Sequence, residues 1–206
     1  MRTMKDAKNY GGIGAILLLI GAFIPYVGVI VSLVGLIFVF IAVKTVSEIT
    51  KEKKIFNHFL YYFILTITAV IAMGAILIGS FFAVGGISFF ETLEHMDPSN
   101  PEAILEFVAP FLGGVILALV VGWIFFIVSS IYLRKSYTAI SEKTNVDAFK
   151  TAGLLYFIGA LTVIIIVGFI IMFIARIFEI IAYFGLPEEY NDQTISPLDQ
   201  KFEKII

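Results

Sequence analysis

Residues 11–46 read GGIGAILLLIGAFIPYVGVIVSLVGLIFVFIAVKTV, an apolar block interrupted by Pro25 and Tyr26. As a single α-helix rising about 1.5 Å per residue, this block would be about 54 Å long. The hydrocarbon core of a membrane is only about 30 Å thick. Proline removes a backbone donor and restricts the residue before it, so Ile24-Pro25-Tyr26 predicts a turn between two helices. The block therefore predicts a short hairpin of two membrane spans, residues 11–24 and 27–46.

The composition excludes a water-soluble domain. Of 206 residues, 60% are hydrophobic and 15% are charged, and the mean hydropathy is +1.01. Such a chain has too few polar side chains to cover a surface in water. The formal net charge of −2 gives no reason to expect a nucleic-acid partner. Cysteine is absent, which removes disulfides and thiol chemistry. No phosphate loop, nucleophile elbow or zinc helix motif is present, so we expect no cofactor.

Further apolar stretches predict a third span at residues 56–82 and a fourth at 111–133. Between them, residues 83–110 carry several acidic side chains and no lysine or arginine. We expect this segment to be an exposed acidic loop. Within it, Asn100-Pro101-Glu102 predicts a helix start, because asparagine caps free N–H groups and proline suits the first turn.

The last apolar block, from Thr151 to Gly185, contains neither a proline nor a polar turn. In one interpretation a fifth span runs to Ile174 and the residues after it lie in the membrane interface. In the other, the chain reverses near Val167-Gly168 and makes two spans, residues 151–166 and 168–185. We favour the second, which predicts an all-α, polytopic membrane bundle of six spans followed by a polar tail at 187–206; five spans are the alternative.

Small residues recur at seven-residue spacing in the first and last blocks. They are Gly14, Gly21, Gly28, Gly35 and Ala42 in the first, and Gly153, Ala160, Gly168, Ala175 and Ala182 in the last. This spacing keeps small side chains on one helix face, where backbones can approach closely. The two sets align with one inserted residue, which favours a hairpin in both blocks. Chance in a glycine-rich apolar chain is the competing explanation.

The charges favour the same topology. With six spans, each of the 14 lysines and arginines lies on one side of the membrane or inside a span. By the positive-inside rule, both termini are then cytoplasmic and the loop at 83–110 is external, in a cell membrane. With five spans, Arg176 and the two lysines of the tail would lie outside. We expect the basic segments Lys44–Lys54 and Arg134–Lys150 to contact anionic lipid headgroups. The N-terminus lacks a small-residue cleavage site, so we expect a mature first helix.

Arg176 and Glu179 are the only charged pair deep in an apolar block. Their i, i+3 spacing places them on one helical face, where they could neutralise each other. An ionisable pair inside a membrane is a candidate functional site, and a snorkelling pair near the interface is the alternative.

The acidic loop offers a second candidate group, at Glu91, Glu94, His95 and Asp97. Their oxygen and nitrogen atoms could gather a divalent cation. The group matches no known ligand pattern, however, and an acidic outward loop follows from topology alone. We therefore expect no metal site.

Two stretches of the chain resemble an uncharacterised archaeal membrane-protein family known as domain of unknown function 996. The first joins Gly11-Gly12-Ile13-Gly14 to Ile24-Pro25-Tyr26-Val27-Gly28. The second joins Lys143-Thr144-Asn145-Val146 to the run from Phe149 to Ala160, FKTAGLLYFIGA. The resemblance covers most of Tyr10 to Leu186 and implies a small polytopic protein of an archaeal cell membrane. The family has no established activity, so no functional residues can be transferred from it.

Three functions compete. The small-residue faces and the scarcity of polar groups in the spans favour a structural or accessory membrane subunit, or a homo-oligomer. Short, glycine-broken hairpins in corresponding places of two halves are also typical of transporters. The few polar residues within the spans then restrict the solute to an apolar or amphiphilic one. Without paired acids or histidine clusters in the spans, we do not expect an enzyme.

Overall fold

The computed structural model describes residues 2–165 and 167–190, and α-helix is the only regular secondary structure within them. The helices are α1 (Met4–Gly21), α2 (Gly28–Ile49), α3 (Lys53–Ala83), α4 (Ser88–Glu94), α5 (Pro101–Thr144), α6 (Asp147–Thr162) and α7 (Val167–Phe184). The all-α class expected from the sequence is confirmed. Most of the expected polar tail at 187–206 lies outside the described residues.

Four of the described helices, α2, α3, α5 and α7, are long and apolar enough to cross a membrane. Helices α1 and α6 do not meet the same criteria of length and low charge. Helix α6 has 16 residues, and α1 carries three charged side chains, Lys5, Asp6 and Lys8, among its 18. The structure thus supports a set of apolar helices, and the count of six spans stays a prediction.

The chain divides into two compact units, the first made from Met1–Leu60 together with Ser130–Ile206. Helix α1 opens this unit with a capping box. The Asp6 amide donates to Thr3 Oγ1 at 3.3 Å, and the Thr3 amide donates to the Asp6 carboxylate at 2.7 Å. Each bond satisfies a backbone donor that a helix start leaves without a partner.

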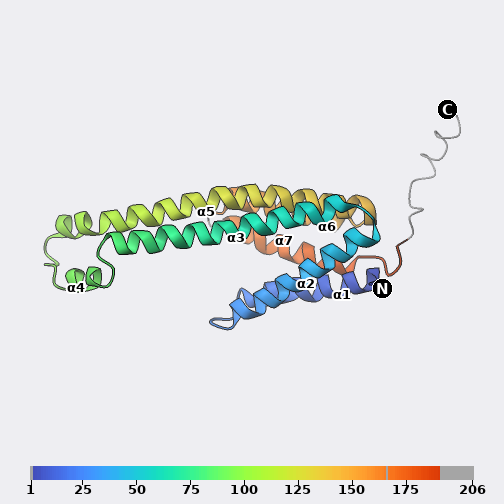
Figure 1. The fold of residues 1–206 in the computed structure, drawn as a ribbon, viewed down its shortest axis with the longest axis horizontal. Helices are drawn as coiled ribbons and strands as arrows, with labels where there is room; N and C mark the ends of the chain where they lie inside the picture. The colour runs from blue at the N-terminus through green and yellow to red at the C-terminus, as the bar shows by residue number, and fades with distance from the viewer. Residues whose placement is uncertain (1, 166, 191–206) are drawn as a thin grey trace, which may run out of the picture. The chain divides into compact units, whose positions relative to one another are not determined.

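Helices α1 and α2 form the predicted first hairpin and lie side by side (Figure 1). The turn at Ile24-Pro25-Tyr26 is confirmed, and Tyr26 adopts a left-handed φ of 61° there. Two glycine pairs bring the helices together. A Cβ added to Gly14 would lie 2.7 Å from the carbonyl oxygen of Gly35, and one added to Gly21 would lie 2.8 Å from that of Gly28. The helix backbones therefore touch where the small residues face each other.

Helices α6 and α7 form a second hairpin in the same unit. Helix α6 ends at Thr162 and α7 begins at Val167, close to the predicted reversal. The two helices are thus separated within the last apolar block, and the choice between five and six membrane spans stays a prediction. Helix α7 also packs on α1, where a Cβ added to Gly12 would lie 2.6 Å from the Phe184 ring.

The second unit, Tyr61–Ser129, contains most of α3, the short helix α4 and the first half of α5. Its α3 and α5 segments run antiparallel, because Gly122 faces Met73 while Gly114 faces Ser80. Phe89 of α4 is buried and stacks on the Phe107 ring of α5, with ring centroids 5.0 Å apart.

The expected loop at 83–110 is shorter than predicted, because α4 and the start of α5 lie within it. The predicted helix start is confirmed: α5 begins at Pro101, and Asn100 Oδ1 accepts from the Ala103 amide at 3.2 Å. Helix α5 then continues through Pro110 and far past the expected span at 111–133. Its 44 residues correspond to about 66 Å. The predicted span is shorter than the helix because hydropathy identifies only its apolar part. The α-helical hydrogen bonding of the backbone continues into the polar residues on either side.

Candidate functional site

The charged pair of α7 forms a short ion pair. Arg176 Nη1 donates to Glu179 Oε2 at 2.5 Å, as the i, i+3 spacing permits. The two side chains differ in burial, since 24% of the Arg176 side chain is exposed against 1% for Glu179. The carboxylate is therefore the inner member of the pair, and the guanidinium lies between it and the surface of the unit.

Two tyrosines from other helices complete the hydrogen bonding of Glu179. The Tyr137 hydroxyl, from α5, donates to Oε1 at 2.5 Å, and the Tyr156 hydroxyl, from α6, donates to Oε2 at 2.5 Å. Both tyrosines are buried. A buried carboxylate is very costly unless it is paired and hydrogen-bonded. Here three donors from three helices reach its two oxygens. We call Tyr137, Tyr156, Arg176 and Glu179 the Glu179 cluster.

Aromatic contacts connect members of the cluster with each other and with Phe149. The Arg176 guanidinium carbon lies 5.2 Å from the centroid of the Tyr156 ring, a cation–π geometry. Phe149 stands edge-on to both Tyr137 and Tyr183, with ring centroids 5.5 Å and 5.0 Å away. In a buried apolar environment the attraction between opposite charges is stronger than in water. The formal charges of Arg176 and Glu179 cancel, so the cluster as a whole is neutral.

Glycine at position 153 lets α6 approach α5 beside the cluster. A Cβ added there would lie 3.0 Å from Arg134 Cα and 3.2 Å from Tyr137 Cβ. Gly168 has a different neighbourhood, because an added Cβ would meet the backbone of Thr162 and Val163 at the α6–α7 turn. Of the glycines singled out in the sequence, Gly153 is therefore the one next to the cluster. Gly14, Gly21, Gly28 and Gly35 lie in the α1–α2 interface.

Sequence reasoning found the charged pair but missed both tyrosines. Tyr137 lies in the basic segment after the fourth expected span, and Tyr156 lies inside the fifth, so no spacing rule connects them to Glu179. A weaker signal was available. A carboxylate in an apolar block needs donors, and hydroxyl groups at the ends of the neighbouring apolar blocks are the natural source.

The acidic group at Glu91, Glu94, His95 and Asp97 lies at α4 and the turn after it. Asp97 Oδ1 accepts from both the amide and the hydroxyl of Ser99, at 2.9 Å and 2.7 Å. These bonds lower the pKa of Asp97. Nowhere in residues 2–165 and 167–190 do three or more histidine or acidic side chains gather closely enough to hold a metal ion.

Comparison with known proteins places the chain in a family. A family described as "Protein of unknown function (DUF996)" matches residues 31–177. The chain belongs to the DUF996 family. The resemblance seen in the sequence is thereby confirmed. The matched region of this DUF996 protein contains Tyr137, Tyr156 and Arg176, and ends two residues before Glu179.

A relative of this DUF996 protein is an uncharacterized protein of the archaeon Methanocaldococcus jannaschii. The two chains are 37% identical over 194 residues, which cover 92% of this chain and 97% of the relative. No solved structure matches the DUF996 chain. The family match and this relative establish the family, and neither names a molecular function.

Proposed function

We propose that this DUF996 protein is a multi-pass membrane protein with a structural or accessory role, acting as a homo-oligomer or as the subunit of a larger membrane assembly. Its side chains support the membrane location. Large apolar residues are strongly exposed on the long helices, among them Val29 (69%), Ile71 (65%) and Ile116 (62%). Exposure of such apolar surfaces to water is unfavourable, whereas lipid chains solvate them. In lipid, the backbone N–H and C=O groups must be paired internally, as they are within α-helices.

In the proposed topology, six helices cross the membrane in the order α1, α2, α3, α5, α6 and α7. The N-terminus, the α2–α3 turn, the α5–α6 turn and the end of α7 then share the cytoplasmic side. The basic residues near those ends would meet anionic headgroups there. The acidic connection around α4 lies on the opposite side. Helices α1 and α6 are short crossings, which neighbouring helices or a locally thinner bilayer would accommodate.

The Glu179 cluster is the observation that carries the structural role. Its carboxylate is 1% exposed and receives hydrogen bonds from α5, α6 and α7. A site that binds a solute or performs acid–base chemistry needs groups that can exchange partners. A neutral, closed cluster instead fixes three helices in one arrangement, and buried networks of this kind specify a unique packing. We accordingly propose a role without catalysis, cofactor or nucleic-acid partner.

The proposal is tested by reconstitution. We expect the purified protein to resist alkaline extraction from liposomes and to leave the flux of ions, sugars and amphiphilic dyes at the level of empty liposomes. Arg176→Ala liposomes should be equally silent. Purification in a mild detergent should yield a second copy of the chain or a defined membrane partner.

Two outcomes would contradict this assignment. If alkaline treatment extracted the folded protein from liposomes, the protein would not be an integral membrane protein. Flux that the wild type supports and Arg176→Ala abolishes would instead favour a small transporter or channel for an apolar or amphiphilic solute, with the Glu179 cluster as part of its path.

A further inference from the structure

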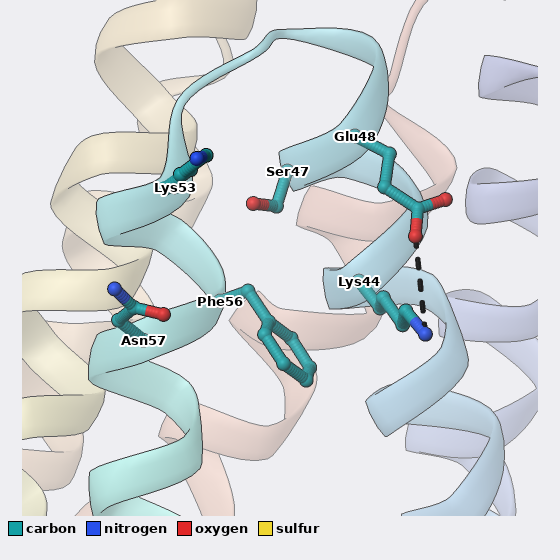
Figure 2. A pocket seen from close by; sticks show the side chains of 6 residues that line it. All are labelled: Lys44, Ser47, Glu48, Lys53, Phe56 and Asn57. Carbon is teal, nitrogen blue, oxygen red and sulfur yellow. Dashed lines mark ion pairs between the residues drawn. The ribbon is translucent and has the colours of Figure 1, made fainter.

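A small cavity lies in the corner between α2 and α3, inside the first unit. Its volume is about 250 Å³, enough for a phosphate group and its immediate substituents. Figure 2 shows side chains from both helices around it, with Phe56 between the α2 and α3 sides. The lining residues are Lys44, Ser47, Glu48, Lys53, Phe56 and Asn57. We call this cavity the corner pocket.

The corner pocket is positively charged on balance, because two lysines and one glutamate line it. Lys44 Nζ lies 3.9 Å from Glu48 Oε1, and about half of each side chain is exposed, so this ion pair is weak and a stronger anion can displace it. Lys53 forms no salt bridge with any residue that the structure describes. It is also the first residue of α3, where the helix dipole adds a partial positive charge.

Hydrogen bonds hold the walls of the pocket in place. The Ser47 hydroxyl donates across the turn to the Glu52 carbonyl at 2.9 Å. From α5, the buried Ser136 hydroxyl donates to the Ile55 carbonyl at 2.8 Å. The lysines therefore extend from a fixed corner, and a ligand would not have to order the backbone before it binds.

An apolar stripe leads away from the pocket along α2. Ile30, Ile37 and Lys44 follow one another at seven-residue spacing, nearly two helical turns, so they lie along one face. Ile30 is 63% exposed, Ile37 57% and the intervening Leu33 55%. A cationic pocket at one end of an exposed apolar stripe matches a molecule with an anionic head and a long hydrocarbon chain.

We propose that the corner pocket binds the phosphate headgroup of an anionic membrane lipid, with Lys44 and Lys53 on the phosphate and an acyl or isoprenoid chain along the α2 stripe. The inference rests on the proposed membrane insertion, which places the α2–α3 corner at the headgroup level. It goes further by assigning a specific site. A free phosphate ion would use the same two lysines but would gain nothing from the stripe.

Native mass spectrometry of nanodisc-reconstituted protein tests the site. The probe is phosphatidylglycerol at low mole fraction in phosphatidylcholine, and the readout is the apparent affinity for retained phosphatidylglycerol. Two variants of equal charge are compared, Lys44→Gln/Lys53→Gln in the pocket and Lys51→Gln/Lys54→Gln, which removes two basic residues of the same segment outside the lining. We expect the pocket variant to bind at least about tenfold more weakly than the control, because it loses direct contacts to the phosphate.

Equal weakening in the two variants would overturn the proposal, since it would mean general attraction to the basic segment. Inorganic phosphate, titrated at millimolar concentration, should not displace the lipid; displacement at equal affinity would also overturn the assignment to a lipid. Both variants should insert and melt like the wild type. Failure of the wild type to insert would defeat the proposed function, whereas insertion without a lipid preference would defeat only the corner pocket.

Discussion

At the scale of single residues, Glu179 is the unusual member of this chain. It is an acidic side chain in a strongly apolar helix, and its burial is tolerated because Arg176 cancels its charge and two tyrosine hydroxyls complete its hydrogen bonding. A buried ion pair does not by itself make a fold more stable than an apolar equivalent would. It does make the loss of one partner costly. The stability of this region therefore depends on the presence of all four side chains of the cluster.

Removal of Glu179 should be much more damaging than removal of an exposed acid. We expect Glu179→Ala to lower the free energy of unfolding in detergent by about 3 to 5 kcal/mol, because the buried Arg176–Glu179 ion pair is broken and the hydrogen bonds of both tyrosine hydroxyls to the carboxylate are lost. Glu48→Ala, at the exposed pair of α2, should cost at most about 1 kcal/mol. Thermal unfolding measures both. A cost at Glu179 no larger than at Glu48 would contradict a closed cluster.

At the scale of elements, the two hairpins depend on glycines where helices touch. In the first hairpin Gly14 faces Gly35 and Gly21 faces Gly28, so the glycines pair symmetrically about the turn at Ile24-Pro25-Tyr26. In the first apolar block, the glycines at seven-residue spacing thus belong to a single antiparallel interface between α1 and α2. Close approach increases van der Waals contact between backbones, which matters in lipid because burial of apolar surface there gains little.

Alanine at Gly14 should therefore destabilise the hairpin although alanine is the better helix former. Its Cβ would lie 2.7 Å from the Gly35 carbonyl oxygen and 2.9 Å from the Val39 amide nitrogen, both backbone atoms. We expect a cost of about 1 to 2 kcal/mol after the gain in helix propensity. Gly74→Ala is the matched control, because its added Cβ would meet no atom within 4 Å beyond the adjoining residues and backbone of its own helix. It should be neutral or stabilising in the same melting measurement.

At the scale of the whole molecule, the proposed membrane topology assigns each connection between helices to one side of the membrane. The chain is free of cysteine, so single cysteines report their positions without background. The six-span proposal places Ser99 and Ile164 outside and Lys51 inside. The five-span alternative instead keeps Ile164 within the bilayer.

Labelling of intact cells with a membrane-impermeant maleimide tests this topology. Ser99→Cys and Ile164→Cys should react in intact cells, because one lies in the acidic connection and the other in the α6–α7 turn, where the side chain is 66% exposed. Lys51→Cys should react only after the membrane is opened. An Ile164→Cys variant that stays unlabelled in intact cells, beside a labelled Ser99→Cys, would contradict six crossings.

The amino-acid sequence by itself determined the helical class, the turn at Pro25, the start of α5 at Asn100-Pro101 and the family. These features follow from local chemistry, namely apolar run length, proline restriction and capping, which neighbours in the chain control. Only the tertiary structure brought Tyr137 and Tyr156 to Glu179, and Lys44 opposite Lys53 in the corner pocket. Those contacts join different helices. The rotation and register of packed helices depend on how their side chains fit together, and the residue pattern of a single segment does not contain that information.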